Sequence, residues 1–489
     1  MKKQILCRAK FMLPLTANNP NERIQDGYVL SEGEIIKEVG AYSDEIGKRL
    51  LETYGDSLYV MGQTQTGDIP MLNTILMPAF VKAHGHDHEQ PLIGIAKDEP
   101  LTAWLDHAVN PFTGYINKFY DKLCDALGAS PQLVTYRMAR LCDIHYGITT
   151  SMVHHCNYNK YHVKEIVQAN EAAGTTMIVA IGGQDRFYVE DILDTPEEAL
   201  KRLDDALILQ RSERTMICPG PDQLFSNSRK VLVPLKAWAR EHNTLFHIHS
   251  SEEPKTTQWF QAEIEPGMTP VEFAQSIDIL DENSVLAHQV NCGPKDIDIL
   301  AKTGTKIVHN PLANTILGSG MPPIIDMMKA GVPVAISTDG SGSADNQNII
   351  AAARLASQYQ KARLQDATVL KSHELLPMIT SVPANILRQN QGELIAGKQA
   401  DFVMLRLNTP NMTPTRVDNV MENVIWAADG SEIDTVVARG RILKEKGVVQ
   451  NFIDGTEPEK IMSDVQKLSE LYAEHRKTAP EMKGTGAHT

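Results

Sequence analysis

The sequence predicts an α/β fold, a (β/α)8 TIM barrel, because strand-like and helix-like segments alternate along most of the chain. Eight short runs rich in β-branched and apolar residues are separated by longer segments with helical spacing, and β-rich segments flank them on both sides. That alternation is typical of parallel βαβ units. The eight runs are 74–77, 147–150, 176–181, 215–218, 244–249, 284–288, 305–309 and 332–339.

Residues 1–70 are predicted to form short strands and turns. The segment 27–40 predicts a β-hairpin, because two β-rich runs flank a Ser-Glu-Gly turn at 31–33. The first residues combine basic and apolar side chains, but Arg8 and Lys10 interrupt the apolar stretch and no small-residue cleavage site follows. We therefore expect no signal peptide, and no apolar run approaches the 18 residues that suggest a membrane span.

The helices between the eight runs carry recognisable start signals. Thr195 and Thr269 each precede a proline and are followed three residues later by glutamate, which is the pattern of a capping box with proline at the first helical position. Ser130 precedes Pro131 in the same way. These signals place helices between the strand candidates, as a barrel requires.

The C-terminal part returns to strands and turns and ends in a helical tail. Residues 400–405 and 435–443 are strand-like, and apolar residues from Ile461 to Tyr472 recur at helical spacing, whereas 483–489 are expected to be disordered. The pattern leaves open whether the two β-rich ends are separate or pair into one small sandwich. The expected domains are 1–70, 71–390 (the barrel), 391–455 and 456–489 (the helical tail).

Composition excludes several classes of protein. Hydrophobic residues make up 42% and charged residues 22% of the 489 residues, which argues against long disorder and fibrous repeats. The net charge of −14 argues against general nucleic-acid binding, which needs a basic surface. Six scattered cysteines contain no CxxC pair, which favours reduced thiols in the cytoplasm over a zinc ribbon or a disulfide framework.

Chemically active side chains lie at the ends of five predicted strands. Two histidines in an HxH pair point to the same side of an extended chain, so that both can bind one metal ion. A single histidine or a Thr-Asp-Gly turn is weak evidence alone, but the ends of barrel strands meet at one face. The five strand ends contribute, in chain order, His84 with His86, His247 with His249 and Glu252, His288, His309 and Asp339.

These stretches resemble the amidohydrolase superfamily. The chain is similar to its aminohydrolase branch, which includes guanine, cytosine and S-adenosylhomocysteine deaminases and the s-triazine chlorohydrolases and aminohydrolases. The resemblance covers about residues 77–444 and implies a small β-sandwich domain, built from the N- and C-terminal segments, beside the barrel. The matching stretches are MPAFVKAHGHDHE, HIHSSEE, LAHQVNC, HNPLANTILGSGMPPI, STDGSGSADNQN and GELIAGKQADFVMLRL.

The resemblance implies one divalent metal ion, with zinc the first choice and iron the second. It implies catalytic roles for Glu252, His288 and Asp339, in which Glu252 transfers protons and His288 orients the nucleophilic water and polarises the substrate. Asn346 is expected to shape the pocket. The implied metal ligands are His84, His86, His249 and Asp339, and the expected substrate-binding residues are Glu89, Trp104, His154, His155, His309 and Asn314.

The predicted function is a metal-dependent hydrolytic deaminase that releases ammonia from an amino-substituted nitrogen heterocycle: a purine, pyrimidine, pterin, triazine or creatinine-like ring. Dechlorination of a chloro-s-triazine at the same site is one alternative. A cyclic amidase is another, but its two metal ions need a bridging lysine on the fourth strand, and no lysine lies between Lys201 and Lys230. A non-catalytic scaffold would not need Glu252. We expect a homodimer or larger assembly that acts on a small molecule, with neither nucleic acid nor membrane as partner.

Overall fold

A computed structural model describes residues 4–210 and 212–478. The chain divides into two compact units, each assembled from three separate stretches. The expectation of disorder at 483–489 lies outside the described residues. Unit 1 comprises Met1–Val81, Asp143–Thr150 and Asn348–Phe452, and unit 2 comprises Lys82–Cys142, Ser151–Gln347 and Ile453–Thr489.

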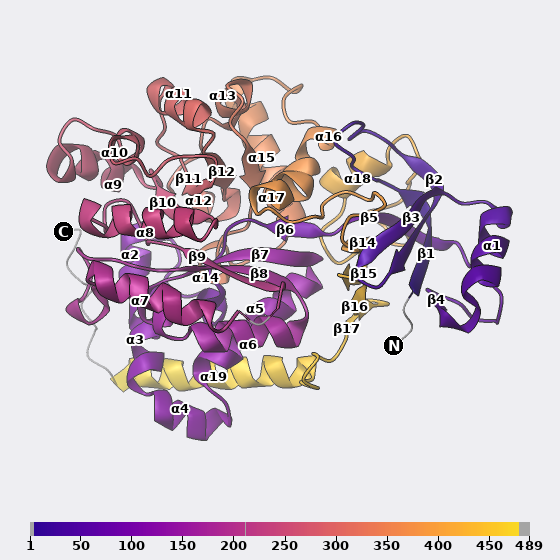
Figure 1. The fold of residues 1–489 in the computed structure, drawn as a ribbon, viewed down its shortest axis with the longest axis horizontal. Coiled ribbons are helices and arrows are strands. Elements are labelled where there is room, and N and C mark those ends of the chain that lie inside the picture. The colour runs from indigo at the N-terminus through magenta and orange to yellow at the C-terminus, as the bar shows by residue number, and fades with distance from the viewer. Residues whose placement is uncertain (1–3, 211, 479–489) are drawn as a thin grey trace. The chain divides into compact units, whose positions relative to one another are not determined.

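Unit 1 is organised around a mixed nine-stranded sheet to which both ends of the chain contribute. The strand order is β17-β16-β15-β14-β5-β1-β2-β3, with β4 also paired to β1. Figure 1 shows the indigo N-terminal and the orange-to-yellow C-terminal strands in this one region. The predicted small β-domain built from both ends is therefore confirmed. Its strands are β1 (Gln4–Met12), β2 (Ile24–Glu32), β3 (Ile35–Ala41), β4 (Leu58–Val60), β5 (Leu72–Pro78), β14 (Phe402–Arg406), β15 (Ile433–Ala438), β16 (Arg441–Glu445) and β17 (Val448–Val449).

The predicted hairpin at 27–40 is confirmed, since β2 and β3 pair antiparallel. Apolar residues of β1, β5 and β14 on one face of the sheet form a buried cluster that includes Met12, Leu76 and Phe402. The helices of this unit are α1 (Asp44–Tyr54), α15 (Ile349–Leu364), α16 (Ser372–Leu375), α17 (Ser381–Ile386) and α18 (Val420–Trp426).

The assignment of 74–77 to the barrel is wrong. These residues belong to β5, which pairs parallel with β1 and antiparallel with β14. The apolar run 74–82 contains two strands, and Pro78, which has no N–H to donate to a ladder, ends the first of them. The first barrel strand is β6, which begins two residues later.

Eight strands in chain order, β6 to β13, form the barrel, which confirms the predicted fold. They make two four-stranded sheets, β6-β7-β8-β9 and β10-β11-β12-β13. A parallel bridge between Gln223 and His249 joins the sheets on one side. On the other, Ser337 Oγ donates to the carbonyl of His84 (2.6 Å) and accepts from its N–H (3.3 Å). The strands are β6 (Phe80–Lys82), β7 (Ile148–His155), β8 (Thr176–Ile181), β9 (Thr215–Pro219), β10 (Phe246–Ser250), β11 (Ser284–His288), β12 (Lys306–His309) and β13 (Val334–Ile336).

The helices begin where the sequence signals place them. Thr195 and Thr269 form complete capping boxes, and the Ser130 hydroxyl accepts from the N–H of Leu133 at the start of α5. The helices and short helical turns here are η2 (Asp87–Leu92), α2 (Leu101–Trp104), η3 (Leu105–Val109, a π-helical turn), α3 (Asn110–Lys118), α4 (Tyr120–Leu127), α5 (Pro131–His145), η4 (Asn157–Tyr161), α6 (Val163–Ala173), η5 (Glu190–Ile192), α7 (Pro196–Leu207), α8 (Arg229–Glu241), α9 (Pro254–Trp259), η6 (Phe260–Ile264, a second π-helical turn), α10 (Pro270–Ser276), α11 (Pro294–Thr303), α12 (Pro311–Ile316), α13 (Ile324–Lys329), α14 (Ser341–Ala344) and α19 (Pro458–Thr478).

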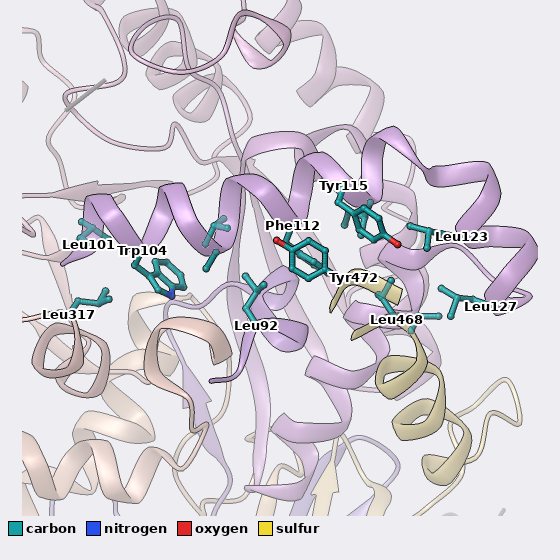
Figure 2. Packing of buried hydrophobic residues seen from close by; sticks show 14 residues of the cluster. Leu92, Leu101, Trp104, Phe112, Tyr115, Leu123, Leu127, Leu317, Leu468 and Tyr472 are labelled. Atoms are coloured by element: carbon teal, nitrogen blue, oxygen red, sulfur yellow. The ribbon is translucent and has the colours of Figure 1, made fainter. Parts of the chain in front are cut away.

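The tail forms the predicted helix, α19, which packs against α3 and α4 of the same unit (Figure 2). The ring of Tyr472 lies edge-on to Phe112, with 5.1 Å between centroids, and 5.2 Å from the ring of Tyr115. Leu101 and Trp104 belong to the same buried cluster. Among the described residues, none of the helices is long and apolar enough to cross a membrane.

Candidate metal and catalytic site

The structure brings the four predicted metal ligands together in unit 2. His84 and His86 follow β6, His249 lies in β10, and Asp339 follows β13. Nε2 of His84 is 3.2 Å and Nε2 of His86 is 3.5 Å from Oδ1 of Asp339. The Nε2 atoms of His86 and His249 are 3.1 Å apart. Three imidazole nitrogens and a carboxylate oxygen thus converge on one point.

The Nδ1 atoms of His86 and His249 contact backbone carbonyl oxygens. His86 Nδ1 lies 3.2 Å from the carbonyl oxygen of His154, and His249 Nδ1 lies 2.6 Å from that of Asp222. A carbonyl can only accept, so each Nδ1 carries the proton and each Nε2 presents a lone pair. Burial holds the pKa of His84 and of His86 well below the ordinary value, so both are neutral, as metal ligation requires.

The donor set fits a divalent transition-metal ion. Nε2 of His84 is buried and makes no hydrogen bond, although Oδ1 of Asp339 lies close to it. The nitrogen of His84 and the oxygen of Asp339 are both electron-pair donors, and no hydrogen bond joins them. A cation bound between them would interact favourably with both. Three imidazoles and one carboxylate are typical ligands of zinc and iron.

Glu252 and His288 lie beside these ligands. His288 Nε2 is 3.5 Å from Oε2 of Glu252 and 3.8 Å from Oδ2 of Asp339. On its other side, His288 Nδ1 accepts from the side-chain amide of Asn314 at 3.0 Å, with the amide of Asn310 at 3.4 Å. The proton of neutral His288 therefore sits on Nε2, where it faces the two carboxylates.

Burial shifts the pKa of Glu252 and the pKa of His288 in opposite directions. It raises the pKa of Glu252 well above the ordinary value, and the charges of Asp339 and Glu253 raise it further. It also lowers the pKa of His288 to about 3. A carboxyl group whose pKa is raised can both take up a proton and return it, whereas His288 stays a neutral donor.

Two of these residues have strained backbones. His288 has φ = 76° and Asp339 has φ = 71°, in the left-handed region that side chains other than glycine seldom adopt. Such conformations cost about 1–3 kcal/mol each and persist where the surroundings hold them. Asp339 is held by Gln347, whose side-chain amide donates to the Asp339 carbonyl at 3.2 Å.

A pocket opens over the candidate ligands. Of the predicted substrate-binding residues, Glu89 and Trp104 line it. Its wall also contains residues that the sequence reasoning did not assign to binding: Leu105, Val109, Cys156, Asn157, Tyr188, Asp222, Gln223, Leu317 and Ser343. Asp222 could have been found, because it follows the end of the fourth barrel strand, as Asp339 follows the last.

The other predicted contact residues are placed around the site. His154 packs edge-on against His249, with 4.4 Å between ring centroids, and Asn314 contacts His288. His155 packs against Tyr136, and His309 is fully buried at the end of β12 with no hydrogen bond to either ring nitrogen. None of these four is among the described residues that line the pocket, and their roles in binding stay predictions. Asn346 is exposed.

Glu89 is fixed by the backbone that follows Asp339. Its Oε2 accepts from the N–H and the hydroxyl of Ser343, both at 3.0 Å. A β-carbon added to Gly340 would lie 2.0 Å from that oxygen, so only glycine allows this approach.

We expect Gly340→Ala to lower the free energy of unfolding by about 1–3 kcal/mol, because the new methyl group must displace the Glu89 carboxylate. Urea denaturation of the purified variant measures the effect. Gly293→Ala is the matched control, since its new β-carbon would meet nothing closer than 3.8 Å. Equal stability of the two variants would contradict the assigned contact.

Comparison with known proteins agrees with this geometry. The sequence profile described as the Amidohydrolase family matches residues 75–443. The chain belongs to the Amidohydrolase family. This amidohydrolase is 30% identical over 419 residues to a 5'-deoxyadenosine deaminase of Methanosphaera stadtmanae, covering 84% of this chain and 93% of that protein. It is 29% identical over 369 residues to a 5-methylthioadenosine/S-adenosylhomocysteine deaminase of Thermococcus kodakarensis, covering 76% and 82%.

A solved structure supports the fold of the amidohydrolase. A zinc-bound adenosine deaminase from Xanthomonas campestris matches with a TM-score of 0.81 at 20% identity, covering 96% of this chain and 98% of that one. The predicted enzyme class, an amidohydrolase-family deaminase that acts on C–N bonds other than peptide bonds, is confirmed by the family match and by the curated relatives.

Proposed function

We propose that this amidohydrolase is a metal-dependent hydrolytic deaminase of adenine nucleosides of the 5'-deoxyadenosine and 5-methylthioadenosine class. The observation that carries the proposal is the convergence, at the floor of one pocket, of four metal-ligand atoms with a buried carboxyl of raised pKa. The two curated relatives compared above act on 5'-deoxyadenosine and on 5-methylthioadenosine or S-adenosylhomocysteine, which supports an adenine nucleoside over the other heterocycles.

His84, His86, His249 and Asp339 would hold one divalent ion, for which we propose zinc. When bound, the ion supplies Lewis acidity, which makes water acidic enough to deprotonate near neutral pH. The described part of the fourth barrel strand and its flanks provides no lysine to bridge a second ion. One ion per chain is therefore the expected content.

Glu252 would move the proton. It takes one proton from the attacking water as the C6–O bond forms and passes it to N1 of the ring, and it then transfers the proton of the new C6 hydroxyl to the departing amino group as the C6–N bond breaks, which leaves the 6-oxo form. His288 Nε2–H would donate a hydrogen bond at the reacting centre, since its other nitrogen is occupied by Asn314. The products are the 6-oxopurine nucleoside and ammonia.

We expect Asn314→Leu to lower kcat/KM about 10- to 100-fold, because His288 then loses the amide that fixes its tautomer and ring orientation. Steady-state rates of ammonia release measure the change. Thr315→Val on the same helix is the control, since the Thr315 hydroxyl bonds only within α12, to Pro311. Equal rates for the two variants would remove Asn314 from the mechanism.

Ammonia release from the zinc-loaded enzyme tests the proposed function. We expect turnover of 5'-deoxyadenosine and 5-methylthioadenosine, and none of guanine, cytosine, melamine or creatinine at comparable concentrations. Ammonia from one of those rings alone would overturn the choice of adenine nucleosides. Chloride from atrazine without ammonia from any nucleoside would favour dechlorination, and two metal ions per chain with hydrolysis of a cyclic amide would favour an amidase.

We also propose that the enzyme acts in the cytoplasm, as a homodimer or larger assembly. All six cysteines are free thiols, which agrees with a reducing compartment. Sedimentation velocity of the purified protein tests the assembly, and a monomer at micromolar concentration would contradict it.

A further inference from the structure

A second group of metal-binding side chains lies at the ends of β7 and β9. A ring nitrogen of His154, the sulfur of Cys156 and a carboxylate oxygen of Asp222 all lie within 4.8 Å of one another. All three residues are buried, and none of them is among the four proposed ligands of the zinc ion. Imidazole, thiolate and carboxylate are the three kinds of side chain that bind zinc in proteins.

Two glycines bring these strand ends together, although β8 lies between β7 and β9 in the sheet. A β-carbon on Gly182, directly after β8, would lie 2.9 Å from Cα of Cys156. A β-carbon on Gly220, directly after β9, would lie 2.6 Å from the carbonyl carbon of Ala180. Glycine is the residue that allows backbones to approach this closely, so the placement of Cys156 and Asp222 is built into the barrel.

The side chain of His154 is available to a metal ion. Its Nδ1 is buried and makes no hydrogen bond, and its Nε2 has one long contact, 3.4 Å, to the carbonyl oxygen of Pro221. Burial holds the pKa of His154 well below the ordinary value, so the ring is neutral. Either nitrogen can present a lone pair while the other carries the proton.

Cys156 is a thiol, and a metal ion would have to displace its proton. Burial raises the pKa of the Cys156 thiol well above the ordinary value, and Asp222, to which the thiol donates a hydrogen bond, raises it further. When a divalent ion binds, the S–H bond breaks, the proton leaves to solvent and the sulfur binds the ion as a thiolate. The thiolate and the carboxylate of Asp222 would together balance the two positive charges of the ion.

We propose that His154, Cys156 and Asp222 form a second, inhibitory metal site, which zinc or cadmium occupies only when metal exceeds one ion per chain. The donor atoms of a tetrahedral zinc site lie about 3.3–3.8 Å apart, so these three must move together by roughly 1 Å. This movement and the release of the thiol proton both weaken binding, which is why the site needs excess metal.

The position of the group explains why an ion bound there would inhibit. Cys156 and Asp222 both line the pocket over the candidate ligands. His88 lines the same pocket, and one of its ring nitrogens lies within 4.8 Å of the Cys156 sulfur, where it is available as a fourth ligand. An ion held by these side chains would occupy space at the pocket wall that a substrate needs.

Cadmium titration of the zinc-loaded enzyme tests the proposed site, because a cadmium–thiolate bond absorbs in the ultraviolet and the four proposed zinc ligands contain no sulfur. We expect one further ion per chain and a charge-transfer band that saturates with it. Cys156→Ser should lose both, whereas Cys292→Ser, which removes another free thiol, should keep both. Absence of the band from the unaltered enzyme, or the same band in Cys156→Ser, would overturn the site.

A second variant keeps the test decisive if Cys156→Ser does not fold. His154→Gln retains the thiol, and we expect it to weaken cadmium binding at least tenfold while the circular dichroism spectrum stays unchanged. Unchanged affinity would exclude His154 as a ligand and overturn the site as assigned.

Inhibition by excess metal tests the second part of the proposal. We expect zinc above one equivalent to inhibit ammonia release, and Cys156→Ser to raise the half-inhibitory zinc concentration at least tenfold. Equal sensitivity of the variant and the unaltered enzyme would overturn the inhibitory role. Cadmium binding is measured without substrate, so it decides the existence of the site even if no adenine nucleoside is deaminated and the proposed function falls.

Discussion

Replacing Glu252 by glutamine is expected to lower kcat for nucleoside deamination by about 10²- to 10⁴-fold, while the protein still binds one metal ion per chain. The amide keeps the size of the side chain but cannot take a proton from water or return one to the leaving amine. Oε2 of Glu252 lies 3.5 Å from Nε2 of His288. Because Glu252 is not one of the four proposed metal ligands, we expect the substitution to reduce the rate of the reaction and not the binding of metal. Stopped-assay ammonia release and metal analysis of the same preparation measure both quantities.

The neighbouring Glu253 provides the control. It is also a glutamate, but its carboxylate accepts a hydrogen bond from the hydroxyl of Thr256, in the first turn of α9. We expect Glu253→Gln to change kcat less than fivefold. A similar loss in both variants would mean that the negative charge of this segment matters, and not a proton carried by Glu252.

Breaking the buried ion pair between Asp87 and Arg140 is expected to lower the free energy of unfolding by about 3–5 kcal/mol, since a neutral amide would replace the buried carboxylate that accepts two hydrogen bonds from the guanidinium. The guanidinium of Arg140 makes two bonds to the carboxylate of Asp87, at 2.9 and 2.6 Å, and a third to the Ser151 hydroxyl at 3.1 Å. Both side chains are almost fully buried, with 0% and 1% of their surfaces exposed. Urea denaturation of Asp87→Asn measures the loss.

This pair also supports the candidate metal site, because Asp87 directly follows His86. We therefore expect Asp87→Asn to weaken zinc binding, which a competition titration with a chromogenic chelator measures. Asp205→Asn is the control for stability: its partner Lys201 is 73% exposed, and exposed pairs contribute at most about 1 kcal/mol. A loss below about 1 kcal/mol in Asp87→Asn would contradict the stability assigned to this ion pair.

The sequence predicted the barrel well because each of its signals is local. Capping boxes at Thr195 and Thr269 and the runs of β-branched residues depend on neighbours a few positions away. The prediction was wrong at 74–82, where one apolar run contains two strands that belong to different sheets. The sheet to which each strand belongs depends on pairing partners far along the chain, and the local sequence pattern carries no information about those partners.

The gathering of His84, His86, His249, His288 and Asp339 could be predicted for the same reason, since the ends of parallel strands meet at one face of a barrel. The pocket wall could not. Leu105 and Tyr188 come from segments between strands, and their positions depend on how those segments fold back over the barrel. The tautomer of His288 could not be predicted either, because it depends on a contact with Asn314, 26 positions along the chain.

The packing of α19 has a consequence for how the enzyme is made. A ribosome synthesises the helical segment 101–127 early, yet Leu468 and Tyr472, which complete its buried cluster, emerge more than 340 positions later. During that interval the apolar face of the segment lacks the side chains that α19 later provides, and transiently exposed apolar surface of this kind is what chaperones bind. The cluster behind the pocket wall is thus completed only after residues 468–472 have been synthesised, so a nascent chain that stalls before residue 468 would lack part of this packing.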